Sequence, residues 1–202
     1  MNEMFSQRTY RILRAFLAVW LRILHPVIHV HGRENIPEGP CMLCCNHSSF
    51  SDPVWVIVYG KLSRLPRIMA KQELMKLPVL GWLYRKLGAF PVDRGATDLK
   101  AVQTTLKTLR EGNRVLIFPE GTRVRKGKKV EAHSGALLMA NRAKVPVVPI
   151  YVSTKKHLFS RINLRFGEAY FPEYAAAKAT PEELTLRSAE LLEKIYAMGD
   201  ER

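Results

Sequence analysis

The sequence predicts an α/β fold in which a mixed, mainly parallel sheet is flanked by helices on both faces. Short apolar runs of β-like composition alternate with helical stretches along the chain, which is typical of βαβ crossovers. The 202 residues are 47% hydrophobic and 25% charged, which provides the core of one domain and excludes a disordered chain. A separate amphipathic helix is expected in front of this domain.

That N-terminal segment ends at Pro26. At about 100° per residue, its four arginines share one arc of about 120°. They are Arg8, Arg11, Arg14 and Arg22, and the opposite arc collects Phe5, Ile12, Leu13, Phe16, Leu17, Trp20, Ile23 and Leu24. A helix with a cationic face and an apolar face suits the membrane interface, although the apolar face could instead pack on the protein's own core.

The same segment lacks the features of a spanning helix and of a cleavable signal peptide. Its longest uncharged run, residues 15–21, is much shorter than the roughly 20 apolar residues needed to span a bilayer. Arginines interrupt the apolar stretch, and no small-residue cleavage site follows. We therefore expect residues 1–26 to form an amphipathic membrane-associating helix and residues 27–202 to form one folded domain.

The first half of this domain begins with two strands. Residues 35–40 contain two prolines and a glycine and predict a turn, so the apolar runs on either side, 27–31 and 41–45, are expected to be strands. Asp52 as N-cap and Pro53 at the first helical position predict a helix to about residue 59. Further along we expect a strand at 67–71, a helix at 79–87 and an extended piece at 90–92.

The second half contains the clearest strand, residues 114–118. A helix at 97–110 precedes it and is stopped by Gly112. Near the C-terminus, Thr180 and Glu183 form a capping box with Pro181 at the first helical position, which predicts a helix to about residue 198. The remaining elements are a helix at 134–142 and strands at 145–152 and 162–166.

Charge and cysteine content narrow the possible partners. With 32 basic and 18 acidic residues the net charge is +14, which favours an anionic partner: nucleic acid, a phosphate-bearing substrate or a membrane surface. Cys41, Cys44 and Cys45 lie in one apolar run. No second Cys or His pair follows at zinc-site spacing, so we expect a buried strand, no metal, no disulfide framework and a reducing compartment.

The first candidate for chemistry is His47 with Asp52. On a continuous helix these side chains would point about 140° apart, so they meet only if a tight turn separates them. A carboxylate on one ring nitrogen orients a histidine and makes its other nitrogen a better base. The alternative is that Asp52 only caps a helix and His47 is an ordinary loop residue. Serines flank His47, but the chain has no G-x-S-x-G elbow of a serine hydrolase.

The second candidate follows the strand at 114–118. Glu120, Thr122 and Arg123 come at the end of this strand, where open α/β sheets bind their ligands. The planar guanidinium of Arg123 is suited to phosphate. The next basic residues are expected to be a solvated loop face: Arg125, Lys126, Lys128 and Lys129. The chain contains neither a P-loop nor a dinucleotide-binding fingerprint.

Together these motifs resemble the glycerolipid acyltransferases. Asn46-His47 with Asp52 after four intervening residues resembles the HX4D signature of that family, and residues 118–123 resemble its third block. The second block resembles Lys71-Gln72-Glu73-Leu74, Pro78, Gly81 and Gly88-Ala89-Phe90-Pro91-Val92-Asp93-Arg94, and the fourth resembles residues 145–150. The four blocks occur in family order over residues 41–152. One departure is Val124, where a serine often follows the arginine.

The resemblance implies an acyltransferase domain at 27–202 that moves a fatty acyl chain from acyl-CoA or acyl-carrier protein to the free hydroxyl of lysophosphatidic acid, making phosphatidic acid. It implies that His47 is the general base and Asp52 orients it, without an acyl-enzyme, a metal or a cofactor. The substrate-binding residues that it implies are Glu120, Gly121, Thr122, Arg123, Lys71, Arg94 and Asn46.

The resemblance also implies a place in the cell and leaves alternatives. We expect a peripheral or monotopic protein on the cytoplasmic face of the membrane. The acceptor could instead be glycerol 3-phosphate, another lysophospholipid or a lyso-aminolipid. From a different class, the chain could be a non-catalytic basic membrane-binding protein. Nucleic acid is not expected as a partner, because no recognition motif or interleaved aromatic residues accompany the basic loop.

Overall fold

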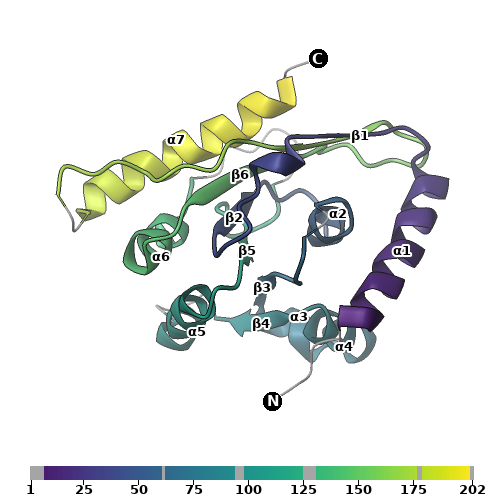
Figure 1. The fold of residues 1–202 in the computed structure, drawn as a ribbon, viewed down its shortest axis with the longest axis horizontal. Coiled ribbons are helices and arrows are strands. Elements are labelled where there is room, and N and C mark those ends of the chain that lie inside the picture. The colour runs from purple at the N-terminus through teal and green to yellow at the C-terminus, as the bar shows by residue number, and fades with distance from the viewer. Residues whose placement is uncertain (1–6, 61, 94–97, 125–130, 177–178, 201–202) are drawn as a thin grey trace.

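The computed structural model describes the chain apart from residues 1–6, 61, 94–97, 125–130, 177–178 and 201–202 (Figure 1). Its helices are α1 (Gln7–Leu24), the 3-10 helix η1 (Arg33–Asn35), α2 (Asp52–Tyr59), α3 (Gln72–Lys76), α4 (Pro78–Lys86), α5 (Leu99–Arg110), α6 (Gly135–Ala143) and α7 (Pro181–Asp200). Its strands are β1 (Ile28–His31), β2 (Met42–Cys45), β3 (Arg67–Lys71), β4 (Ala89–Val92), β5 (Val115–Ile117), β6 (Val147–Val152) and β7 (Ile162–Phe166).

The strands of the described chain form one seven-stranded sheet in the order β1-β7-β6-β2-β5-β3-β4. Neighbouring strands run parallel except β6 and β7, which are antiparallel. The predicted α/β fold with a mixed, mainly parallel sheet is therefore confirmed. Strand β2 lies between β5 and β6, and all four of its residues are buried.

Each face of the sheet has its own hydrophobic core, because successive strand residues point to opposite sides. Leu43 and Cys45 of β2 belong to the cluster under α1, α2 and α4, while Met42 and Cys44 belong to the cluster under α5, α6 and α7. Figure 1 shows α1 and α2 on one side of the sheet and α5, α6 and α7 on the other. Since burying one large apolar side chain contributes about 1.5–3 kcal/mol, these clusters hold the layers together.

The three cysteines are part of these cores, as the apolar run predicts. Cys41, Cys44 and Cys45 have no exposed surface and are free thiols. Burial raises the pKa of the Cys41 thiol to about 11, against the opposing effect of nearby Arg114. Thiols that stay protonated pack as small apolar side chains. Among the described residues, no group of three or more His, Cys, Asp and Glu side chains is arranged to hold a metal ion.

Most of the predicted helices and strands are confirmed to within one or two residues at each end. The capping box forms as expected: the Thr180 N–H donates to the Glu183 carboxylate at 2.8 Å, and the Glu183 N–H donates to Thr180 Oγ1 at 3.2 Å. Helix α5 begins at Leu99, after Asp98 accepts a capping bond from the N–H of Ala101 at 3.0 Å. The short α3 was not predicted, and the extended piece at 90–92 is part of a sheet strand, β4, paired with β3.

The apolar face of helix α1 divides into a buried part and an exposed part. One part packs on the protein: Tyr10 and Leu21 are buried, and the Tyr10 hydroxyl donates to the Ile57 carbonyl at 3.2 Å. The other part is a strip of five side chains that are each 52–67% exposed: Ile12, Phe16, Val19, Trp20 and Ile23. Within the described part of the chain, none of the helices has the length and apolar character needed to cross a membrane.

Candidate active site

The sequence-predicted site residues gather at one edge of the sheet. Strands β2, β5 and β6 are parallel neighbours, so their carboxyl ends lie side by side. The end of β2 leads into Asn46 and His47, and the end of β5 leads into the 118–123 segment. The segment between β6 and β7 starts at the same edge and contributes Lys156.

His47 and Asp52 are in direct contact. The ring nitrogen Nδ1 of His47 lies 3.0 Å from Asp52 Oδ2, across the tight turn that joins β2 to α2. The same oxygen accepts hydrogen bonds from the backbone N–H groups of Ser48 and Ser49, both at 2.7 Å. The turn therefore closes around the carboxylate, and the histidine is held by a residue that a helical arrangement would point elsewhere.

Asp52 does not cap α2, so the prediction that Asp52 is the N-cap of this helix is wrong. The N-cap is Ser51, and Asp52 is the first residue of the helix. Its carboxylate turns back to the preceding loop. The next residue, Pro53, has no N–H that a cap could bind. The alternative in which Asp52 serves only as a cap is therefore excluded by the hydrogen bonds that its side chain makes.

Asp52 is ionised at this site although it is completely buried. Burial opposes ionisation, but the hydrogen bond to His47 and the charge of Lys156 outweigh it, and the pKa of Asp52 is lowered. With Nδ1 engaged by this carboxylate, Nε2 is the nitrogen of His47 that can accept a proton. The imidazole stacks on Phe118, with ring centroids 4.2 Å apart, and its side chain is 12% exposed.

Glu120 lies behind His47. Glu120 is only 1% exposed. Its Oε1 accepts hydrogen bonds from the His47 N–H at 2.9 Å and from the Tyr196 hydroxyl at 3.0 Å. Burial raises the pKa of Glu120, against the opposing effect of the bond from His47. These contacts favour a role in holding the backbone of His47 over the direct acceptor contact that the resemblance implies for Glu120.

The neighbouring Gly121 has a steric reason to be glycine. Its φ is +63°, and a Cβ atom there would lie 2.4 Å from the ring carbon Cδ2 of His133. Thr122 and Arg123 follow as exposed residues. The guanidinium carbon of Arg123 sits 3.7 Å from the ring centroid of Phe50, which comes from the His47 loop. The two predicted motifs therefore meet through this cation–π contact.

The other predicted site residues differ in how they are placed. Lys71 ends β3 and forms an exposed ion pair with Glu73 at 3.2 Å. Arg94 lies outside the described residues. Asn46 is completely buried, and its amide bonds the backbone of Val152 twice, as donor at 2.9 Å and as acceptor at 2.7 Å. This geometry favours Asn46 as a clamp between the ends of β2 and β6 over the substrate contact predicted for it.

Three residues of the site were missed by sequence reasoning. Lys156 pairs with Asp52, Tyr196 of α7 bonds Glu120, and Phe118 carries the His47 ring. In the sequence, Phe118 stands out only as the first residue of the 118–123 motif. Lys156 follows Lys155 in a polar stretch that looks like an ordinary solvated loop, and Tyr196 is one residue of an amphipathic helix. Only their contacts across more than 70 residues of sequence identify Lys156 and Tyr196.

Known proteins resemble this chain in both sequence and fold. A family model described as Acyltransferase matches residues 27–153. The chain belongs to the acyltransferase family. This acyltransferase is 33% identical over 181 residues to the 1-acyl-sn-glycerol-3-phosphate acyltransferase of Bacillus subtilis (strain 168), an alignment that covers 83% of this chain and 89% of that protein. It is 32% identical to the protein of the same name from Streptococcus pneumoniae (strain ATCC BAA-255 / R6), with 78% of this chain and 61% of that protein covered.

A solved structure is also similar to this acyltransferase in fold. The crystal structure of the 1-acyl-sn-glycerophosphate (LPA) acyltransferase PlsC from Thermotoga maritima superposes with a TM-score of 0.73 at 24% identity. The overlap covers 97% of this chain and 80% of that one. The acyltransferase thus shares its fold with a crystallographically known relative over almost its whole length, α1 included.

Proposed function

We propose that this acyltransferase transfers a fatty acyl chain from acyl-CoA or acyl-carrier protein to lysophosphatidic acid, making phosphatidic acid. The observation that carries the proposal is the His47–Asp52 pair, with its Nδ1–Oδ2 distance of 3.0 Å, beside the exposed guanidinium of Arg123. A base next to a phosphate-binding cation is what a glycerol phosphate lipid with a free hydroxyl requires. The activity named for the relatives supports the same reaction.

The chemistry follows from these residues. Nε2 of His47 removes the proton of the acceptor hydroxyl while the oxygen attacks the thioester carbonyl. The carbon–sulfur bond then breaks, the acyl chain stays on the acceptor oxygen as an ester, and the proton passes from His47 to the departing thiolate. Asp52 stabilises the protonated imidazole between these steps. The thioester provides the leaving group, so we propose that no cofactor takes part.

The remaining site residues act on binding and on positioning in this proposal. Arg123 binds the acceptor phosphate, with Thr122 exposed beside it. Lys71 and Arg94 supply further positive charge, as the resemblance implies. Glu120 fixes the His47 backbone, and Gly121 leaves the room that His133 occupies.

The choice of acceptor is tested by offering the purified protein lysophosphatidic acid, glycerol 3-phosphate, another lysophospholipid and a lyso-aminolipid, each with acyl-CoA and with acyl-carrier protein. We expect mass spectrometry to detect phosphatidic acid from lysophosphatidic acid as the fastest product. No phosphatidic acid with either donor would contradict the proposal. Faster acylation of glycerol 3-phosphate would instead assign the protein to that acceptor.

Replacing Arg123 by alanine should raise the KM for lysophosphatidic acid about tenfold or more, since hydrogen bonds to charged groups contribute about 1.5–3 kcal/mol. The kcat should change much less, because Arg123 does not touch the His47–Asp52 pair in the contacts above. Arg110→Ala, at an exposed position on α5, is the matched control and should leave KM unchanged. Steady-state kinetics with the acceptor varied measures both values, and an unaltered KM in Arg123→Ala would argue against the phosphate contact.

We also propose that α1 lies in the membrane interface on the cytoplasmic face. Its exposed apolar strip continues at the C-terminal end of the helix into Leu158 and Phe159, which are 62% and 67% exposed. The N–H of Phe159 donates to the Leu24 carbonyl at 2.8 Å and keeps this loop beside α1. The exposed Arg8, Arg11 and Arg22 flank the strip and suit anionic headgroups. Free cysteines fit a reducing compartment.

Replacing Phe16 and Trp20 together by serine should weaken binding to vesicles that contain anionic phospholipid. Each side chain removed from the interface costs about 1.5–3 kcal/mol of apolar burial, so the partition coefficient should fall at least tenfold. Phe171→Ser with Leu186→Ser is the matched control, because both residues are 58–63% exposed and Leu186 lies on α7, across the sheet. Vesicle sedimentation measures the partitioning, and equal binding of the two double variants would locate the membrane contact elsewhere.

A further inference from the structure

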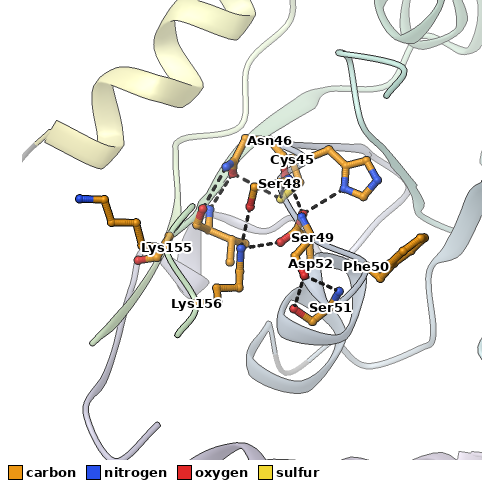
Figure 2. Close-up of polar contacts among 12 residues, drawn as sticks. Cys45, Asn46, Ser48, Ser49, Phe50, Ser51, Asp52, Lys155 and Lys156 are labelled. Atoms are coloured by element: carbon orange, nitrogen blue, oxygen red, sulfur yellow. Dashed lines mark hydrogen bonds and ion pairs between the residues drawn. The ribbon is translucent and has the colours of Figure 1, made fainter. Parts of the chain in front are cut away.

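Lys156 reaches the catalytic loop from a distant part of the chain. It lies between β6 and β7, and its side chain is 7% exposed. Its Nζ sits 2.7 Å from Asp52 Oδ1 and donates to Ser48 Oγ at 2.8 Å. Figure 2 shows Lys156 directed toward Asp52 and Ser48, whereas Lys155 points away from them. A buried ammonium is costly unless it is paired, so Lys156 requires an anionic partner at this position.

The two oxygens of the Asp52 carboxylate have different partners. Oδ2 accepts from His47 and from the N–H groups of Ser48 and Ser49, and Oδ1 faces Lys156. A carboxylate held on both sides cannot tilt or turn away without losing the ion pair or some of the three hydrogen bonds. Lys156 therefore helps to hold the carboxylate in the plane in which it faces His47.

The same charge affects how strongly the pair holds a proton. Asp52 alone would stabilise a protonated His47, and a cation on the other oxygen offsets that effect. Among the residues that the structure describes, the other titratable or charged groups around the pair are Cys45 of β2, Tyr84 of α4, Glu120 and Arg123 after β5, and Tyr196 of α7, which acts through Glu120. Burial raises the pKa of the Cys45 thiol and of the Tyr84 phenol, so both stay neutral near pH 7. Lys156 is the cation in direct contact with the Asp52 carboxylate.

We propose that Lys156 is a positioning residue of this acyltransferase: it holds the Asp52 carboxylate toward His47 and lowers the proton affinity of the His47–Asp52 pair. The proposal rests on His47 being the general base of the proposed function. A lower proton affinity keeps the base free at lower pH, so activity extends further to the acidic side. Lys156 touches neither substrate nor reacting atoms in this role, since it acts through Asp52.

The test is the pH profile of kcat. Lys156→Met keeps an unbranched side chain that is one atom shorter and removes the charge, and we expect the acidic limb to move to higher pH by about one unit. The direction is the same whether the extra proton is held by the imidazole or by the unpaired carboxylate. At neutral pH we expect kcat to fall about 10²-fold, because the pair is also misplaced, with the acceptor KM nearly unchanged. Lys156→Arg retains the charge and should keep the acidic limb of the unmodified protein.

Lys155→Met is the matched control, since Lys155 is exposed, and it should match the unmodified protein throughout. An unshifted acidic limb in Lys156→Met would overturn the proposal. If circular dichroism shows that this variant does not fold, Lys156→Gln takes its place, because the glutamine amide can still donate to Ser48 while the charge is absent. The same shift of the acidic limb is then expected, and an unshifted limb would again overturn the proposal. His47→Ala, measured alongside, separates the proposed general base from the proposed role of Lys156. An active His47→Ala variant refutes the general base. An inactive His47→Ala variant, together with an unshifted acidic limb in Lys156→Met, refutes only the role of Lys156.

Discussion

Replacing His47 by alanine should lower kcat for phosphatidic acid formation by about 10²- to 10⁴-fold, the usual contribution of a positioned general base. The imidazole is stacked on Phe118 and bonded to Asp52 through Nδ1, so its orientation is held and Nε2 is left for the acceptor hydroxyl. Alanine leaves the hydrogen bond between the His47 backbone N–H and Glu120 intact, because that bond does not involve the side chain. Substrate binding and vesicle binding should therefore persist while turnover is lost.

The measurement is steady-state turnover together with vesicle sedimentation. His29→Ala is the matched control, because His29 is an exposed histidine on the edge strand β1, and it should behave as the unmodified protein. A His47→Ala variant that keeps turnover within a factor of about three would refute the base assignment, given the size of the effect expected. Loss of vesicle binding in the same variant would show that the substitution damages more than the chemistry.

Replacing Asp52 should have an effect of similar size, for a different reason. Asp52→Asn keeps the shape but removes the charge that stabilises the protonated imidazole, and kcat should fall about 10²- to 10⁴-fold. Asp52→Ala should in addition destabilise the fold by about 3–5 kcal/mol, because Lys156 is left buried without its partner. Turnover and urea unfolding measure the two effects. If both variants kept normal turnover, the proposed role of Asp52 would be wrong.

The lowered pKa of Asp52 also predicts how stability depends on pH. A carboxyl whose pKa is lower in the folded chain than in the unfolded chain contributes stability above its ordinary value of about 4. That contribution is lost as the pH falls through the folded value, since the unfolded chain then binds the proton more readily. The free energy of unfolding should therefore fall less steeply on the acidic side in Asp52→Asn than in the unmodified protein. Parallel curves for the two proteins would contradict the lowered pKa.

Several features of the fold were predictable because they depend on local patterns. The apolar run at 114–118 and the capping box of Thr180 and Glu183 each specify one element through neighbouring residues, and both are confirmed. The edge strand β4 and the short α3 were harder to predict. A strand of four residues or a helix of five carries too few residues to show a period, and these two elements exist because they pair with β3 or pack on α4.

The exposed strip of α1 shows that sequence also limits the prediction of which apolar residues are exposed. A helical projection separates the arginines from the apolar residues, and the structure retains that separation. The projection does not distinguish Leu21, which is 4% exposed, from Phe16, which is 67% exposed, because both are simply apolar. The distinction arises from where α2 packs against the helix.

The sequence by itself determined the fold class, the membership of the acyltransferase family through four ordered motifs, and the pair of residues on which the chemistry depends. Those conclusions depend on composition, local periodicity and short-range spacing, which involve residues that are close to one another in the sequence. Only the tertiary structure decided that Asp52 turns back to His47 instead of capping α2, that Glu120 and Asn46 hold the backbone of the site, and that Lys156 is part of it. The contacts of Glu120, Asn46 and Lys156 follow from the packing of parallel strands, which brings together residues up to 108 positions apart, and no local pattern encodes them. The turn of Asp52 toward His47 is made within one loop, and the ion pair with Lys156 completes it.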